Sequence, residues 1–257
     1  MDKVRIKRVL RAALMRLPGG RALLRAHSLS LARRRFAQAG DAADVFRHHY
    51  EVNEWGDTES VSGPGSTLQY TESIRREIPR LVQDLGVETI LDAPCGDYNW
   101  LQRIDWSTHV SYTGGDIVPA LVERNRSLYG RSGAKFIDLD IVNDPLPSAD
   151  LWLCRDCFIH LSERDIFLAL RNFLRSDIAY LLTSTYPDWD LNTDIPTGFV
   201  RQLNLRLPPF SLGEPARVID DWVEGFAVRQ LALWERTAVE AALASNRRFL
   251  RAVGRRR

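Results

Sequence analysis

The stretch Thr89–Trp100, TILDAPCGDYNW, decides the fold that this sequence predicts. Its first three residues are typical of the end of a short buried strand, and Asp92 stands where that strand leaves the sheet. A proline–cysteine–glycine turn follows, in which Gly96 can take a positive φ and let a ligand approach the backbone. Asp97 is expected to cap a helix that begins near Tyr98. A strand, an acidic tip, a glycine turn and a helix together indicate the ligand-binding corner of a doubly wound α/β sheet.

The charge of this turn argues against a phosphate-bearing ligand. A pyrophosphate site favours Gly-x-Gly-x-x-Gly, with free backbone N–H groups and no carboxylate facing the phosphates. Here Pro94 and Tyr98 stand at the first and third glycine positions, and proline has no N–H to donate. Asp92 and Asp97 also flank the turn. We therefore expect a cationic nucleoside without phosphate, and S-adenosylmethionine (SAM) fits that description through its sulfonium, its amino group and its ribose.

Two segments resemble a known family. DAPCGDYNW resembles motif I of the class I SAM-dependent methyltransferases, in a bacterial branch that writes it Asp-x-Pro-Cys-Gly-Asp-x-x-Trp. WGDTESVSGPGS, from Trp55 to Ser66, is similar to the loop before motif I in that branch. A low-complexity linker is the alternative for this loop, but tryptophan and acids are unusual in linkers, so we favour a lid over the cofactor. The resemblance spans about Trp55 to Trp234. It implies an α/β fold, a Rossmann-like doubly wound seven-stranded mixed sheet whose last strand is antiparallel.

Acidic residues after the next strands are candidate cofactor ligands. Asp116 lies 24 positions after Asp92, close to the spacing of the carboxylate that holds both ribose hydroxyls in a nucleotide-binding sheet; capping the following helix is its other role. FIDLDIVNDPLP resembles the stretch where an acid of the family meets the adenine amino group, which favours Asp140, with Asp138 as the alternative. The expected cofactor-binding set is Asp92, Pro94, Cys95, Gly96, Asp97, Trp100, Asp116, Ile117, Asp138, Asp140, Arg155 and Ser66.

The chemistry is expected after the predicted strand 149–154, where the family brings its acceptor to the methyl group. Arg155, Asp156 and His160 follow that strand, and a helical segment would put Asp156 and His160 on one face. Histidine is the side chain best suited to act as general base on a hydroxyl near neutral pH. We therefore name His160 and Asp156 as catalytic candidates, with a structural role as the alternative for each.

The resemblance implies an enzyme that transfers a methyl group from SAM to a small-molecule or glycan acceptor, through a hydroxyl. The alternatives are a SAM-binding scaffold of the same fold without turnover and, disfavoured by the missing glycines, a dinucleotide-dependent dehydrogenase. SAM supplies the electrophile, so the protein is expected to contribute alignment and the exclusion of water.

Composition indicates one soluble domain with appendages. The chain has 257 residues, 45% hydrophobic and 26% charged. Its three cysteines, Cys95, Cys154 and Cys157, make no disulfide framework and predict free thiols in a reducing cytoplasm. Cys154-x-x-Cys157 lacks a second cysteine pair or a His-x-His, so we expect no metal site. No run reaches the ~20 apolar residues that a membrane span needs.

Two basic ends enclose an acidic body. Residues 1–40 carry eleven basic residues and one acid, residues 245–257 carry six arginines and no acid, and the body has 18 basic and 32 acidic residues. Residues 3–17 and 21–36 predict basic amphipathic helices, which either cover the domain or contact an anionic membrane from the cytoplasmic side. The acidic body disfavours nucleic acid as a partner.

The sequence thus predicts three parts: a basic amphipathic helical extension at 1–40, a methyltransferase domain at 41–246 and a basic C-terminal tail at 247–257. Within the domain, RQLNLRLPPF (201–210) and VRQLALWE (228–235) are expected as the closing strands. The proline-rich stretch 208–222 between them is expected to lie over the pocket, and a single helix is expected at 236–253.

Overall fold

The computed structural model describes residues 42–106 and 110–254. The chain divides into two compact units, Met1–Val45 and Phe46–Arg257, and of the first unit only the opening residues of helix α3 (Ala42–Glu51) are described. The helices expected at 3–17 and 21–36 lie outside the described residues, as does their predicted contact with a membrane. The sheet and the helices packed on it belong to the second unit.

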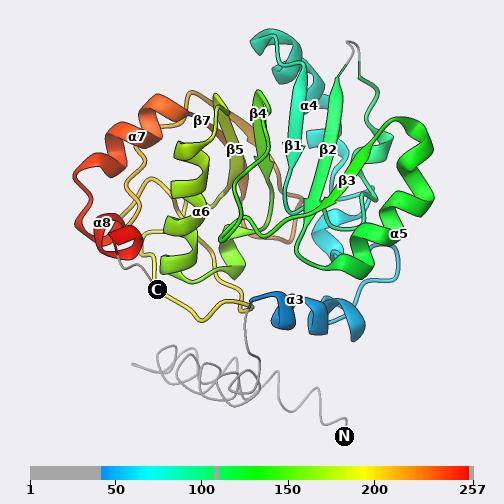
Figure 1. Ribbon diagram of the computed structural model, residues 1–257, viewed down its shortest axis with the longest axis horizontal. Helices are drawn as coiled ribbons and strands as arrows, with labels where there is room; N and C mark the ends of the chain where they lie inside the picture. Colours follow the sequence, from blue (N-terminus) through cyan, green and yellow to red (C-terminus); the bar gives the residue numbers. More distant parts are fainter. Residues whose placement is uncertain (1–41, 107–109, 255–257) are drawn as a thin grey trace, which may run out of the picture. The chain divides into compact units, whose positions relative to one another are not determined.

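Seven strands form one sheet in the order β3-β2-β1-β4-β5-β7-β6 (Figure 1). Strands β1 to β5 pair in parallel, whereas β7 runs antiparallel to both β5 and β6. This arrangement confirms the Rossmann-like, doubly wound, seven-stranded mixed sheet with an antiparallel last strand. The strands are β1 (Thr89–Asp92), β2 (Ser111–Asp116), β3 (Lys135–Asp138), β4 (Leu151–Cys154), β5 (Tyr180–Thr185), β6 (Arg217–Asp220) and β7 (Gln230–Glu235).

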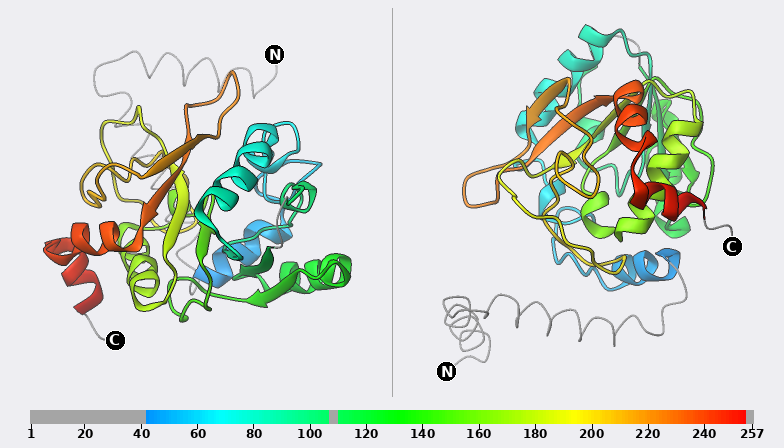
Figure 2. Two further views of the ribbon diagram at one scale, coloured as in Figure 1. Left: turned by 90° about the horizontal axis from the view of Figure 1, so that it is seen from above. Right: turned by 90° about the vertical axis from the view of Figure 1, so that its left-hand side faces the viewer.

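Helices cover both faces of the sheet (Figure 2). Side chains of α4 and α5 pack in one hydrophobic cluster with Ile90 and Leu151, and side chains of α6, α7 and α8 pack in another with Leu91 and Trp152. Neighbouring strand residues enter different clusters because successive side chains point to opposite faces of a sheet. The helices are α4 (Glu72–Leu85), α5 (Pro119–Tyr129), α6 (Glu163–Arg175), α7 (Arg236–Ala244) and α8 (Arg247–Gly254).

The helix expected directly after motif I is absent. Tyr98 has a φ of 58°, which a right-handed helix does not allow, and only a 3-10 turn follows at Leu101–Arg103. The Tyr98 ring packs against the rings of Tyr112 and Phe136, at centroid distances of 4.8 and 5.3 Å. Aromatic packing therefore holds a backbone conformation that helix propensity would not produce.

The expected strand at 201–210 was also wrong. Leu203 and Leu205 alternate with polar residues as in a strand and are fully buried, but the segment pairs with no strand. The amide of Asn192 instead donates to the Asn204 and Pro208 carbonyls, and the amide of Asn204 donates to the Trp189 carbonyl. Side chains satisfy these backbone groups in place of a ladder, and β6 lies further along, at Arg217–Asp220.

The C-terminal stretch folds as two helices where one helix and a tail were expected. Helix α7 ends at Ala244, and α8 begins after Asn246, whose side-chain oxygen accepts from the N–H groups of Arg248 and Phe249. Asparagine is a favoured helix cap, which explains the break. Phe249 is 8% exposed, so α8 belongs to the packed unit through Gly254. None of the helices in the described ranges is long and apolar enough to cross a membrane.

Replacing a central core residue should destabilise the unit strongly. Trp152 is fully buried, packs against Phe158 and Phe173, and donates its ring N–H to the Ala93 carbonyl at 2.9 Å. We expect Trp152→Ala to lower the free energy of unfolding by about 3–5 kcal/mol, measured by urea denaturation. The control is Trp189→Ala, since Trp189 is 40% exposed; equal losses for the two variants would contradict the assignment of this core.

Candidate active site

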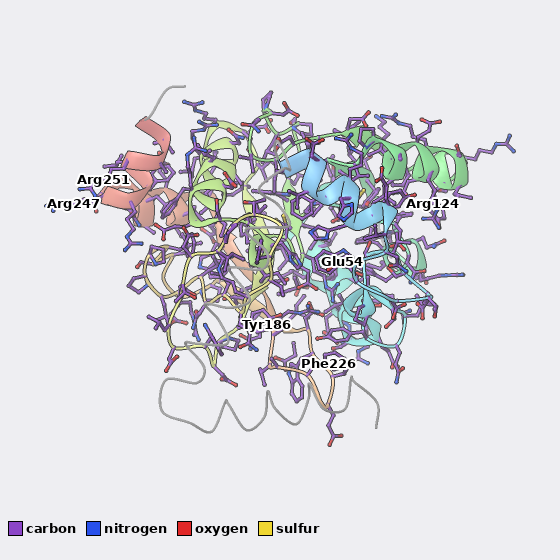
Figure 3. The ribbon with its side chains drawn as sticks, turned by 90° about the horizontal axis from the view of Figure 1, so that it is seen from below. Glu54, Arg124, Tyr186, Phe226, Arg247 and Arg251 are labelled. Atoms are coloured by element: carbon purple, nitrogen blue, oxygen red, sulfur yellow. The ribbon has the colours of Figure 1, made fainter. Side chains whose placement is uncertain are left out.

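The site lies where the strand order of the sheet reverses. Strands β1 and β4 are neighbours, but the chain proceeds from β1 through β2 to β3 and only then returns to β4. In open α/β sheets ligands bind in the crevice outside the carboxyl ends of the strands at such a point. Figure 3 looks onto this end of the unit, where Tyr186 follows β5 and Phe226 lies in the β6–β7 connection.

Two buried carboxyl groups stand at the ends of β1 and β2. Asp92 is 4% exposed and accepts a hydrogen bond of 2.8 Å from the Tyr112 hydroxyl. Asp116 is 6% exposed and accepts from the backbone N–H groups of Gly96 (3.0 Å) and Val118 (3.1 Å). Burial raises the pKa of Asp92 to about 7 and that of Asp116 to about 6. Both pKa values would fall beside a cation, because opposite charge favours the ionised form.

Asp116 keeps the hydrogen-bonding capacity that a ribose would need. Its two backbone donors use different carboxylate oxygens. An ionised carboxylate offers about four acceptor positions, so each oxygen still has a lone pair for one hydroxyl. The role of Asp116 as a ligand of a diol stays a prediction.

The turn after β1 is fixed by its neighbours. Gly96 has the expected positive φ, 55°, and its carbonyl accepts from the Asn125 amide at 2.7 Å. The backbone N–H of Cys95 donates to the Gly115 carbonyl at 2.9 Å. Burial raises the pKa of the Cys95 thiol well above its ordinary value, so this thiol stays neutral and serves packing.

Asp97 faces the loop Asp57–Ser66, which we call the strap. The Asp97 carboxylate accepts from the hydroxyls of Ser60 (3.0 Å) and Ser62 (3.2 Å) and from the backbone N–H of Val61 (3.0 Å). It caps no helix, contrary to the expectation. Asn99 adds two bonds to the same loop, to the Glu59 carboxylate and the Ser66 carbonyl. The segment expected to act as a lid is thus bonded to motif I.

Four charged side chains, three of them buried, form a network beyond the end of β4. Arg155 donates twice to the Asp221 carboxylate, both at 2.9 Å, and once to the Gly65 carbonyl of the strap at 2.7 Å. Arg229 pairs with Asp156 and with Asp221. Burial alone would raise the pKa of Asp156, but the guanidinium groups of Arg229 and Arg155 outweigh it and lower that pKa. Asp156 is therefore an ionised acceptor and a weak base.

Aromatic rings line this network. The Arg229 guanidinium lies 4.8 Å from the centre of the Tyr70 ring, and the Arg155 guanidinium lies 5.4 Å from that of Trp100. Burial raises the pKa of Tyr186 to about 12, so its hydroxyl stays protonated.

Asp156 has a φ of 53°, a conformation that costs free energy for a residue with a Cβ and that clusters at functional sites.

His160 is oriented differently from the prediction. The segment after Asp156 is a 3-10 turn, Phe158–His160, so the two residues do not share a helical face. His160 Nδ1 lies 2.9 Å from the Phe199 carbonyl, which can only accept, so Nδ1 carries the proton and Nε2 the lone pair. Burial lowers the pKa of His160 to about 4, which keeps the imidazole neutral at pH 7. Its ring packs on Trp55, with centroids 4.6 Å apart.

The remaining predicted ligands lie around the same edge. Asp138 is exposed and pairs with Arg126 at 3.2 Å. Asp140 accepts from the N–H of Val142 and from the amide of Asn143, so it holds the turn after β3. Ser66 and Trp100 are buried, whereas Pro94 and Ile117 are partly exposed.

The described residues contain no group of three or more His, Cys, Asp or Glu side chains that could hold a metal ion. Cys95, Cys154 and Cys157 are free and buried.

Sequence reasoning missed five polar residues of this edge: Tyr70, Tyr112, Asn125, Asp221 and Arg229. Tyr112 is a buried position of β2, and nothing in its spacing indicates that its hydroxyl reaches Asp92. Asp221 and Arg229 lie 66 and 73 positions from Arg155 and Asp156, the residues they pair with. No local pattern signals a contact over that separation.

No protein-family model and no curated protein matches the chain. Solved structures do match it. "PigF with SAH" aligns with a TM-score of 0.56 and 16% identity over 81% of this chain and 68% of that one. Magnesium protoporphyrin IX methyltransferase (ChlM) from Synechocystis PCC 6803 with bound SAM aligns with a TM-score of 0.54 and 15% identity, over 76% of this chain and 97% of that one. The likeness shows that the fold is the Rossmann-like methyltransferase fold.

The raised pKa of Asp116 should make stability depend on pH. The folded protein holds this proton more tightly than the unfolded chain, whose carboxyl has a pKa near 3.8. The group therefore reduces stability progressively as pH rises from about 4 to about 6. Relative to wild type, Asp116→Asn should gain about 1–2 kcal/mol of unfolding free energy between pH 5 and pH 8, measured by urea titration at each pH. Subtracting the unfolding free energy of the wild type from that of the variant cancels the contribution of the histidines, which titrate in both proteins. A stability difference that stays constant with pH would contradict the raised pKa of Asp116.

Proposed function

We propose that this protein is a SAM-dependent methyltransferase. The observation that supports this most is the pair of buried carboxyl groups, Asp92 and Asp116, at the reversal point of a methyltransferase-type sheet. Among the described residues, their hydrogen-bond donors are a hydroxyl and two backbone N–H groups, none of which is cationic. Burying a charge without a counter-ion is costly. A cationic ligand with a diol relieves this cost, and SAM has both features.

The chain's own residues take distinct parts in this proposal. Asp116 accepts the ribose hydroxyls, and Asp92 provides negative charge near the amino-acid end of the ligand. Asp140, or Asp138 as the alternative, meets the adenine side. When bound, SAM supplies the methyl group and the positive charge that makes it electrophilic. The protein aligns the acceptor and excludes water, and the strap is the element placed to do the latter.

The acceptor is proposed to be a hydroxyl of a small molecule or glycan. A hydroxyl must lose a proton as the new bond forms, and His160 Nε2 carries a free lone pair in the tautomer set by the Phe199 carbonyl. Asp156 is paired with Arg229 and serves as a hydrogen-bond acceptor that orients the substrate. A cytoplasmic location and a contact of residues 1–36 with an anionic membrane remain part of the proposal.

The alternative is a SAM-binding scaffold without turnover. Calorimetric titration with SAM and with NADH separates the enzyme and the scaffold from a dehydrogenase. The enzyme and the scaffold both give heat with SAM and none with NADH, whereas a dehydrogenase gives heat with NADH. Incubation of the protein with SAM and a cell extract then separates enzyme from scaffold, because only turnover raises S-adenosylhomocysteine (SAH) above the amount that the extract alone produces. Heat with NADH and none with SAM would overturn the proposal.

Removing the ribose ligand should weaken SAM binding. Asp116→Ala deletes a carboxylate that accepts two hydroxyls, each bond to a charged group being worth about 1.5–3 kcal/mol. We expect the Kd for SAM to rise at least about tenfold by calorimetry, with the circular dichroism spectrum unchanged. Glu123→Ala, which removes an exposed carboxylate of α5, is the control. An unchanged Kd for Asp116→Ala would remove Asp116 from the site.

His160 should matter for turnover and not for cofactor affinity. General-base help is typically worth about 10²–10⁴-fold, so His160→Ala should lower SAH production from the active extract by about that factor. Because the pKa of His160 is lowered to about 4, the rate should show no inflection from this group between pH 5.5 and 8. His160→Asn, which can still donate to Phe199, tests packing separately. A loss below about threefold in His160→Ala would assign His160 to structure.

A further inference from the structure

The strap spans the crevice at the reversal point of the sheet. One half is bonded to Asp97, in the turn that follows β1, and the other half is bonded to Arg155, the residue that follows β4. These two strands bound the crevice in which this sheet type binds its ligands. A segment bonded on both sides of that crevice is placed to cover a ligand bound there.

We propose that Asp97 is a positioning residue that latches the strap over the bound cofactor and thereby sets the rate of cofactor release. This deepens the proposed function and rests on it, and it takes Asp97 out of the set of direct cofactor ligands. Asp97 acts through the strap, so it is not a catalytic residue.

Most acceptor positions of the Asp97 carboxylate are already occupied. Its carboxylate receives the Ser60 hydroxyl, the Val61 N–H and the Ser62 hydroxyl of the strap, and also the Asn99 N–H at 3.3 Å. A carboxylate offers about four acceptor positions. Oδ1 accepts from three of these donors and Oδ2 from the Val61 N–H, so at most one buried position remains for the ammonium group of a cofactor. The side chain is 4% exposed, so these charge-assisted bonds are shielded from water.

The strap also explains why residue 96 is a glycine. A Cβ on Gly96 would lie 2.2 Å from the Ser62 hydroxyl oxygen, which no packed structure allows. The same hydroxyl accepts from the Asp97 N–H at 3.1 Å. The sequence suggested that a small residue here makes room for the ligand, but the group that fills the space beside Gly96 is Ser62.

The Asp97 end of the strap is the end suited to open. At the Arg155 end, the Gly65 carbonyl accepts a hydrogen bond of 2.7 Å from a guanidinium that the buried Asp221 carboxylate holds in place. The Asp97 half is flanked by Gly56 (φ 66°) and Gly63 (φ 92°), which can absorb backbone rotation. Thr58 and Glu59 are exposed, so outward movement uncovers little apolar surface.

Two measurements on the full chain test the latch. Hydrogen–deuterium exchange of the free protein reports opening of residues 58–66, and stopped-flow displacement reports the dissociation rate of SAH. The variants are Asp97→Ala, the conservative Asp97→Asn, the pair Ser60→Ala with Ser62→Ala, and the combination of Asp97→Ala with both serine changes. Glu123→Ala is the control. The serine pair leaves motif I untouched, so it keeps the test decisive if Asp97→Ala does not fold.

We expect Asp97→Ala to speed exchange of the strap and dissociation of SAH by about tenfold or more, with β1 exchange unchanged. Asp97→Asn should give a smaller effect, because an amide retains one acceptor oxygen. The serine pair should act in the same direction, and the combined variant should add little, as expected for partners in one interaction.

Other results would overturn the latch. Faster SAH release in Asp97→Ala with unchanged strap exchange would make Asp97 a direct cofactor ligand. Faster strap exchange with unchanged SAH release would mean that the strap does not cover the cofactor. If the wild type binds neither SAM nor SAH, the proposed function fails and the control of release fails with it, while the exchange data still decide whether Asp97 holds the strap.

Discussion

The ion pair between Arg155 and Asp221 is the interaction on which the carboxyl edge of the sheet depends. Both side chains are almost fully buried, at 4% and 0% exposure, and two hydrogen bonds of 2.9 Å join them. Such a pair adds little net stability compared with a pair of apolar side chains of similar volume. Removing one partner, however, leaves an unpaired charge buried where water cannot solvate it. Because Arg155 also holds the strap and Asp221 also holds Arg229, this single pair joins the β4 exit, the β6–β7 connection and the strap.

Four acids of this edge, Asp92, Asp116, Asp156 and Asp221, fall into two electrostatic classes. Asp156 and Asp221 are matched by Arg155 and Arg229, so that half of the edge is neutral within itself. Asp92 and Asp116 have neutral donors in the described part of the chain, and burial raises the pKa values of both. The imbalance favours a positively charged molecule on the β1–β2 side and a neutral or hydrogen-bonding one on the β4–β5 side. A sulfonium cofactor beside a hydroxyl acceptor matches that division of charge.

The sequence predicted the parts of this site that depend on local patterns. The strand–turn order of Thr89–Trp100, the positive φ at Gly96 and the position of Asp116 after β2 follow from residue type and spacing. The prediction failed where tertiary contacts override a local rule. Tyr98 abandons the helical conformation because its ring packs in an aromatic cluster, and Leu203 and Leu205 alternate like a strand because each fills the core from an irregular segment. Contacts between distant segments, such as that of Arg229 with Asp156, cannot be predicted from the local sequence of either segment.

The place of these residues along the chain bears on how the protein is made. Motif I and the β4 exit are synthesised well before Asp221 and Arg229, which stand within the last 37 residues of the 257. During translation, N-terminal parts fold first, so Arg155 and Asp156 emerge from the ribosome long before the charges that allow them to be buried. Until β6 and β7 arrive, water must solvate these two side chains, and the crevice stays open. The carboxyl edge is therefore completed late in synthesis, and a polypeptide cut short before residue 221 contains all five parallel strands but lacks Asp221 and Arg229.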